Sequence, residues 1–523
     1  MLRYRMISAC AAAMLCLTAG SAGAAAPFET DVTASIDKGI EWLAVNGAFN
    51  NPSSAGEAAG LTLLALLEKR PSTDLDVAPQ GYSGASDIDK GRMRKSVAYI
   101  LATAGNLSGD QSYRDGAYLM ALSVYLRSGG PDRGQHADLP ASLPYTIVGA
   151  MNAMFDRFKT YQRESGYWCY SPGYPYCDDS STTQFVVAGL AALRGVYSDV
   201  GQPWADAARL ADLNLMAAKA RQGYVTNGRT LYSTCGDLGG EKGHGYNVGN
   251  TPSPQQTASG TWVQLVGGAD VNDPGVQNYL RWLRNRYVYA NITSVSGDYN
   301  YYSYWYYLWS SSKALLFIRG SSVQPNPDAI TAGSFGRLPA ADAPACGVRQ
   351  VNRDPATLPR VALFGMDGPG YYAAESKDFY FDYAYTILGY QCANGFYSCN
   401  GAPNYWDSYA HQSYALLVLQ RSVGGGCVDV DGIPGCDPTD EQQEALYCDA
   451  DFDSKVTYAD VAAVGKLING TYRMAIPLTP QNEWANYANT GASATVIDAN
   501  DYWQCAFVRA GSRPLKYYET TPE

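Results

Sequence analysis

The chain has 523 residues and a formal net charge of −11, with 49 acidic side chains against 38 basic ones. This acidic balance, together with the lack of any basic tract, excludes a nucleic-acid-binding surface, because phosphate recognition needs clustered Lys and Arg. The length exceeds that of one ordinary domain, so we expect a second, smaller unit beside the main body.

The first 26 residues have the pattern of a secretory signal peptide. Arg3 and Arg5 give a basic start, residues 9–18 form a short apolar stretch, and small residues for cleavage follow at positions 21–24. The apolar stretch is too short to span a bilayer, and no later segment is long and apolar enough to do so. We therefore expect a secreted or periplasmic protein without a membrane span.

Residues 27–422 are expected to form the main body, in which one unit recurs: an amphipathic helix followed by a more apolar one. Ile36, Ile40 and Leu43 show the 3.6-residue period of the first kind. The apolar partners are predicted at 56–67, 114–126, 183–196, 256–266, 302–318 and 411–419. Since helices that are apolar nearly all round belong in an interior, we predict an all-α fold of six inner and six outer helices, closed into an (α/α)6 ring.

Turns that contain Gly and an aromatic residue are expected after the amphipathic helices. They are Asn46-Gly47-Ala48-Phe49, Ser165-Gly166-Tyr167-Trp168, Gln222-Gly223-Tyr224, Ser296-Gly297-Asp298-Tyr299 and Asn394-Gly395-Phe396-Tyr397. With the inner-helix starts at 178–185 and 406–413, these turns resemble the α/α-toroid superfamily of terpenoid cyclases and protein prenyltransferases. The segment from Gln162 to Trp168 is similar to the QxxxGxW repeat of squalene cyclases. The resemblance implies the fold and leaves the activity open, because one fold hosts many activities.

Ten of the twelve cysteines follow the predicted leader, and an even number in an oxidising compartment favours disulfides over zinc. Their spacing predicts three local pairs, Cys169 with Cys177, Cys392 with Cys399 and Cys427 with Cys436. Elimination then leaves Cys448 with Cys505 and Cys235 with Cys346.

The C-terminal unit, residues 448–510, is expected to be a small helical domain of the EF-hand or dockerin kind with a calcium site. It follows a Gly-, Cys- and Asp-rich linker at 423–447 and precedes a tail at 511–523. The ligands are expected to be Asp449, Asp451, Asp453, Lys455 through its carbonyl oxygen, Thr457 and Asp460, the oxygen-rich set that calcium prefers. This loop resembles a dockerin repeat. The second repeat is degenerate, so a cohesin-type partner is less favoured than calcium alone. The alternative is an acidic loop that only caps a helix.

Candidate catalytic residues fall where the inner helices begin. Asp407 and His411 are four residues apart and would share a helix face, which would allow an acid–base pair; Asp178 and Asp179 are the other candidates. Carboxylates at these positions also serve as helix caps, which is the alternative for each of them.

Tyrosine is abundant, with 42 residues against 13 phenylalanines, and suits surfaces that contact polar ligands. Tyr302, Trp305, Tyr306 and Trp309 form one helical stripe that could stack on a sugar, with His244 and Gln184 as further substrate-binding candidates. The alternative for the stripe is packing between helices.

Together these features favour a ring that binds an extracellular polymer, with a polysaccharide as the preferred ligand. If the ring is an enzyme, a polysaccharide lyase or hydrolase is favoured. A non-catalytic binding or scaffold protein is the first alternative, and a diverged terpenoid-cyclase-like enzyme the second, although the ring contains no DxDD acid motif.

Overall fold

The computed structural model describes residues 27–70, 79–171, 174, 177–230, 240–290, 302–319, 329–337 and 349–424. It also describes the backbone of four short strands further on: β1 Glu444–Leu446 pairs antiparallel with β4 Tyr517–Glu519, and β2 Ile476–Pro477 pairs antiparallel with β3 Val496–Ile497. The predicted leader lies outside the described residues. None of the described helices is long and apolar enough to cross a membrane.

The described residues between 27 and 424 form twelve α-helices, which confirms the all-α prediction for this part of the chain. One set is partly exposed: α1 Pro27–Val45, α3 Asp87–Thr103, α5 Ile147–Tyr161, α7 Ala207–Asn227, α9 Pro274–Asn285 and α12 Phe379–Tyr390. The other set is almost wholly buried: α2 Ala59–Leu67, α4 Gln111–Arg127, α6 Ser180–Tyr197, α8 Pro254–Val266, α11 Tyr304–Arg319 and α13 Ser408–Leu419.

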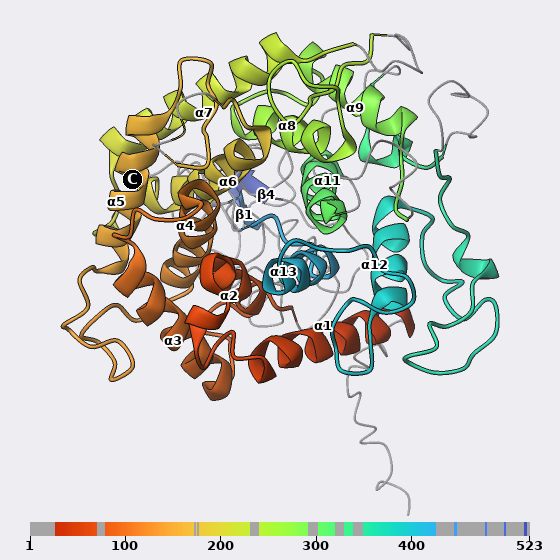
Figure 1. Ribbon diagram of the computed structural model, residues 1–523, viewed down its shortest axis with the longest axis horizontal. Coiled ribbons are helices and arrows are strands. Elements are labelled where there is room, and N and C mark those ends of the chain that lie inside the picture. Colours follow the sequence, from red (N-terminus) through yellow and green to blue (C-terminus); the bar gives the residue numbers. More distant parts are fainter. Residues whose placement is uncertain are drawn as a thin grey trace, which may run out of the picture.

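The buried helices contact one another in a circle (Figure 1). Helix α2 packs against α4, α4 against α6, α6 against α8, α8 against α11, and α11 against α13, which packs back against α2. The partly exposed helices lie against the outside of this circle, for example α1 against α13, α3 against α2 and α7 against α8. We refer to the two sets as inner and outer helices.

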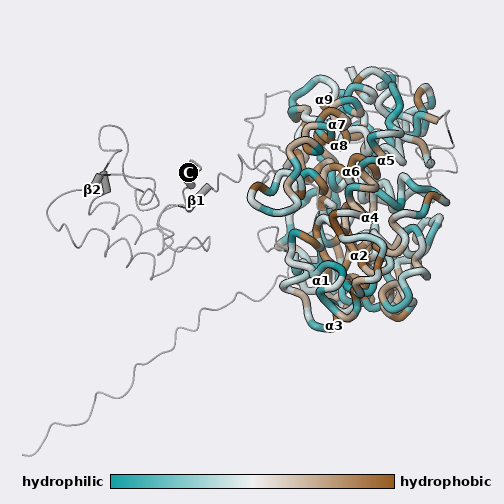
Figure 2. The backbone as a smooth tube through the Cα atoms, turned by 90° about the vertical axis from the view of Figure 1, so that its left-hand side faces the viewer, coloured by the Kyte–Doolittle hydropathy of each residue, from teal (hydrophilic) through white to brown (hydrophobic). Residues whose placement is uncertain are grey.

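Burial explains why the two sets differ in composition. All nine residues of α2 and all thirteen of α8 are buried, because an inner helix has neighbours on every side. Outer helix α5 buries only a stripe, which includes Met151, Met154 and Phe158 at helical spacing. The side view in Figure 2 shows hydrophilic and hydrophobic stretches alternating along the backbone of this body.

Glycines allow neighbouring inner helices to approach backbone to backbone. A β-carbon at Gly60 of α2 would lie 2.6 Å from the carbonyl carbon of Ala117 in α4. A β-carbon at Gly116 of α4 would lie 2.3 Å from the carbonyl oxygen of Phe185 in α6. Real β-carbons do not approach other atoms so closely, so these two contacts require glycine.

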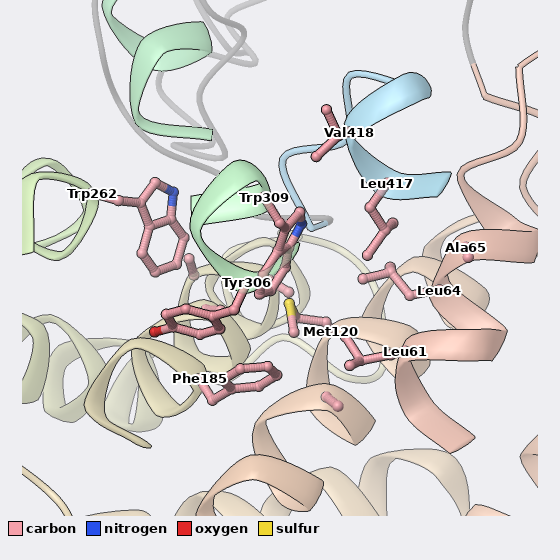
Figure 3. Packing of buried hydrophobic residues seen from close by; sticks show 14 of the residues in the cluster. Leu61, Leu64, Ala65, Met120, Phe185, Trp262, Tyr306, Trp309, Leu417 and Val418 are labelled. Atoms are coloured by element: carbon pink, nitrogen blue, oxygen red, sulfur yellow. The ribbon is translucent and has the colours of Figure 1, made fainter. Parts of the chain in front are cut away.

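Aromatic side chains fill the centre of the inner circle (Figure 3). Trp309 of α11 stacks on Tyr414 of α13 with ring centroids 5.3 Å apart, and it lies 5.5 Å from the ring of Phe185 in α6. Tyr306 lies 6.2 Å from the same phenylalanine. Because α6 is not adjacent to α11 or α13 in the circle, these contacts run across it. A large ligand would therefore bind at an end of the ring.

The predicted Gly-aromatic turns are present at three positions. Gly47, Gly166 and Gly395 have φ values of 88°, 93° and 92°, a region that favours glycine. The prediction of a turn at Gln222-Gly223-Tyr224 is wrong, because α7 continues to Asn227. Gly223 serves packing instead: a β-carbon there would lie 2.5 Å from the carbonyl oxygen of Ser165. The turn predicted at Gly297 lies outside the described residues.

Two of the predicted disulfides are present. Cys169 is bonded to Cys177 and Cys392 to Cys399, with Cα–Cα distances of 5.5 and 5.3 Å. Each cystine closes a short loop beside a Gly-aromatic turn, between an outer helix and the next inner one. The cysteines of the other three predicted pairs, Cys235–Cys346, Cys427–Cys436 and Cys448–Cys505, lie outside the described residues.

Candidate functional site

The inner helices begin at one end of the ring, which we call the mouth. Polar and aromatic contacts join the first turns of neighbouring inner helices there. Asp110 N donates to Glu57 Oε1 (2.8 Å), and Ser180 Oγ donates to Gln256 Oε1 (2.7 Å). The hydroxyls of Ser259 and Tyr306 are 2.8 Å apart. The ring of Trp305 stacks on that of His411, with centroids 4.0 Å apart. The mouth therefore gathers most of the predicted site residues at one end of the ring.

Asp407 caps helix α13. Its Oδ1 accepts a hydrogen bond from the backbone N–H of Ala410 at 2.7 Å, an interaction that contributes about 1 kcal/mol to a helix. His411 donates its backbone N–H to the carbonyl oxygen of Asp407, as in any helix, but its imidazole forms no hydrogen bond with the carboxylate. The structure does not join these two groups as an acid–base pair.

His411 is enclosed by aromatic rings. Besides Trp305, its ring lies 4.6 Å from Tyr405 and 5.0 Å from Phe396. Burial lowers the pKa of His411 to about 3, so the imidazole is neutral at neutral pH. The backbone of Tyr397 opposes this effect and raises the pKa of His411, although neither ring nitrogen reaches full hydrogen-bond geometry with a described residue.

The adjacent carboxylates Asp178 and Asp179 differ in their surroundings. Asp179 caps α6, with its Oδ1 accepting from Thr182 N at 2.8 Å and Ser181 Oγ at 2.7 Å, and burial raises its pKa. Asp178 is half-buried, lies 2.6 Å from Nε of Arg163, and accepts from Ser165 Oγ at 2.7 Å. Asp179 therefore has the alternative role of a helix cap, whereas Asp178 forms an ion pair with Arg163.

Gln184 is buried where α6, α8 and α11 meet. Its Oε1 accepts hydrogen bonds from the hydroxyls of Tyr306 at 2.5 Å, Ser310 at 2.8 Å and Ser259. Two predicted ligand-binding residues, Gln184 and Tyr306, thus bond to each other and hold three inner helices together beneath the mouth.

His244 holds the loop of residues 240–253 over the starts of α6 and α8. Its Nδ1 lies 2.7 Å from the carbonyl oxygen of Gly245, so this nitrogen carries the proton and Nε2 accepts from the hydroxyl of Tyr167, also at 2.7 Å. Burial lowers the pKa of His244 to about 4. Ser180 N donates to the carbonyl oxygen of Tyr246, which attaches the same loop to α6.

A buried ion pair anchors the other side of this loop. Arg286, at the end of α9, donates to Glu241 through Nη2 at 2.7 Å and Nη1 at 3.0 Å, and both side chains are 0% exposed. Asn285 Nδ2 also donates to Glu241 Oε2, at 2.9 Å. The fork geometry of guanidinium and carboxylate suits such a bidentate pair.

The aromatic stripe of α11 is mainly packing. Trp305, Tyr306 and Trp309 are buried, and only Tyr302, which precedes the helix, is exposed. Lys313, one turn further on, places its Nζ 3.5 Å from the ring centroid of Trp309 and 4.1 Å from that of Trp262. Burial lowers the pKa of this amine well below its usual value.

A cavity of about 80 Å³ lies at the mouth beside the start of α4. Asp115 lines it and is held on both sides, by Arg114 Nη2 at 3.0 Å and Arg157 Nη2 at 2.8 Å. The volume suits a few water molecules and is too small for a sugar ring.

Six aromatic side chains are exposed in the part of the chain that the structure describes, and all of them lie at the mouth. They are Tyr161, at the end of α5, and Tyr174, Tyr246, Tyr302, Tyr405 and Trp406, which precede α6, α8, α11 and α13. We call these six residues the aromatic rim; their exposed fractions run from 37% to 68%. Only Tyr302 is among the ligand-binding residues predicted from sequence.

The predicted calcium ligands Asp449, Asp451, Asp453, Lys455, Thr457 and Asp460 lie outside the described residues. Within the described ranges, no group of three or more His, Cys, Asp and Glu side chains is placed to hold a metal ion.

The described residues between 27 and 424 thus form an all-α body with a circle of inner helices and a mouth bordered by exposed aromatic rings. No protein-family model, curated protein or solved structure matches the chain. The function is therefore inferred from the mouth itself.

Proposed function

We propose that this protein is exported and that its helical ring is a complete (α/α)6 toroid which binds an extracellular polysaccharide at the aromatic rim. The observation that carries this proposal is the position of the exposed aromatic residues in the described ranges, all of which lie at one end of the ring. The C–H groups on one face of a sugar ring pack against an aromatic face, while Tyr hydroxyls and the Trp N–H serve the sugar hydroxyls. Exposed aromatic residues gathered in one place mark a binding surface.

The candidate catalytic groups are held in other interactions, which favours binding over cleavage. Asp407 and Asp179 cap helices, Asp178 pairs with Arg163, and the pKa of His411 is too low for general acid–base work near neutral pH. A terpenoid-cyclase-like activity is disfavoured as well, because Phe185, Trp309 and their neighbours occupy the centre of the ring where a prenyl chain would lie.

Replacing Trp406 by Ala is expected to weaken binding of a hexasaccharide about 30-fold, since a central aromatic contact contributes about 2 kcal/mol. Binding is measured by calorimetry on the full chain with a panel of hexasaccharides. The matched control is Trp204→Ala, because Trp204 lies in the connection after α6, at the end of the ring opposite the mouth. Equal losses in both variants, or no binding by the unmodified protein, would contradict the proposal.

We also propose that the C-terminal unit binds calcium through Asp449, Asp451, Asp453, Lys455, Thr457 and Asp460, on the strength of the sequence spacing alone. A chelator is expected to lower the melting temperature of this unit, because a ligand present at 100 times its Kd stabilises a fold by about 2.7 kcal/mol. Added calcium should restore the transition. The variant Asp451→Asn/Asp453→Asn should not respond, and an equal response in both proteins would refute the site.

A further inference from the structure

Exposed carboxylates precede three of the inner helices at the mouth. Glu57 precedes α2, Asp110 precedes α4 and Asp407 precedes α13, and all three are exposed. Asp407 directly follows Trp406, so one of these carboxylates borders the most exposed ring of the rim.

None of these three carboxylates forms an ion pair with a described residue, although Lys95 donates to Asn50 Oδ1 and Arg114 to the carbonyl oxygen of Ser108 in the same connections. Residues 46–58, 104–110 and 391–407 contain no Lys or Arg, and the structure describes all three segments. The basic residues in the other described connections to the inner helices are largely engaged: Arg163 with Asp178, Arg286 with Glu241, and Arg229 with the carbonyl oxygen of Gly249. Lys242 lies in the loop of residues 240–253.

The rim also contains an aromatic pair that can hold an uncharged ring. Tyr302 and Trp406, from the connections before α11 and α13, lie with centroids 4.8 Å apart at an interplanar angle of 35°. Tyr405 lies next to Trp406, and its ring contacts that of the buried His411. This place offers stacking surface, and the charge beside it is negative.

From the aromatic pair and the exposed carboxylates at the mouth that form no ion pair, we infer that the rim selects a neutral polysaccharide and discriminates against polymers of uronic acids. This inference rests on the proposed function. A uronate polymer carries a negative charge on every sugar and would meet the carboxylates of Glu57, Asp110 and Asp407, none of which forms an ion pair with a described residue. A neutral pyranose polymer is not repelled by these carboxylates and stacks on the same aromatic rings.

The test compares neutral hexasaccharides (cellohexaose, xylohexaose and chitohexaose) with hexagalacturonate, by calorimetry on the full chain at low and at high salt. At least one neutral probe should bind, and hexagalacturonate should bind at least about tenfold more weakly at low salt, with the gap narrowing as salt screens the charges. The variant Glu57→Gln/Asp110→Asn/Asp407→Asn should bind hexagalacturonate more tightly and the neutral probe unchanged. Asn retains the helix cap at position 407.

A matched variant, Asp37→Asn/Asp156→Asn/Asp212→Asn, removes three carboxylates from the outer helices and should change neither affinity. Tighter binding of hexagalacturonate than of every neutral probe would overturn the inference while leaving the proposed polysaccharide binding in place. An unchanged affinity of the mouth variant for hexagalacturonate would also overturn it. Failure of every probe to bind would instead overturn the proposed function.

Discussion

Replacing Glu241 by Leu is expected to lower the free energy of unfolding by about 3–5 kcal/mol, because the substitution leaves the guanidinium of Arg286 buried without its carboxylate. Both side chains are fully buried, so water does not compensate for the lost charge. Asn285 Nδ2 loses an acceptor in the same substitution. Urea denaturation at pH 7.5 measures the change.

Two further variants separate charge from packing in this experiment. The double substitution Glu241→Leu/Arg286→Met should recover most of the loss, because removing a buried pair together is far less costly than breaking it. Lys159→Ala, which removes an exposed ion pair with Asp212, should change stability by less than about 1 kcal/mol. A double variant that is as unstable as the single one would show that the charge is not the cause.

Lowering the pH from 8 to 5 is expected to cost the fold about 2 kcal/mol for each of its two buried histidines. The pKa of His244 is lowered to about 4 and that of His411 to about 3, while an unfolded histidine has a pKa near 6.5. Below pH 6.5 the unfolded chain therefore binds protons that the folded chain does not. The stabilisation is complete above pH 6.5 and is lost as the pH falls towards the folded values.

Buried carboxylates oppose this trend. Burial raises the pKa of Asp382 to about 6, so this group destabilises the fold as the pH rises from about 4 to 6, the opposite sign. The histidine contribution is isolated by comparing the unmodified chain with His411→Phe and His244→Phe at both pH values. Each substitution should reduce the difference between pH 8 and pH 5 by about 2 kcal/mol, whatever it does to stability at pH 8.

The chain contains three histidines, so the control is available within the same protein. His136 lies in an exposed loop beside Asp138, so His136→Gln serves as the control for replacing a histidine outside the core. If His411→Phe keeps the full pH dependence, the imidazole of His411 exchanges protons freely in the folded state.

Inner helices were well predicted from sequence. Their observed ends differ from the predicted ones by at most one residue, and their starts by at most three. The predicted starts are less accurate than the predicted ends, because the helices begin with polar cap residues such as Asp179 and Ser253. These residues are not part of the apolar repeat from which the helices were predicted. The cysteine spacing likewise predicted both described disulfides.

The candidate site was predicted less well. Asp407 and His411 are four apart, but Asp407 is the cap residue, with φ −141° and ψ 134°, and so lies outside the helical geometry that aligns such pairs. The stripe on α11 shows the same limit: an inner helix buries all its faces, so a regular aromatic spacing does not tell which face would reach a ligand. Four of the six rim residues have no periodic signal, because Tyr174, Tyr246, Tyr405 and Trp406 lie in loops.

The sequence by itself determined the helices, their alternation between partly exposed and buried, and the local cystines. Each of these depends on residues close together in the chain, where apolar spacing, capping and short loops act directly. Only the tertiary structure decided which polar groups meet, that aromatic rings fill the centre, and that the exposed ones gather at the mouth. Those properties depend on contacts between helices far apart in sequence, and their energies arise only when the ring closes.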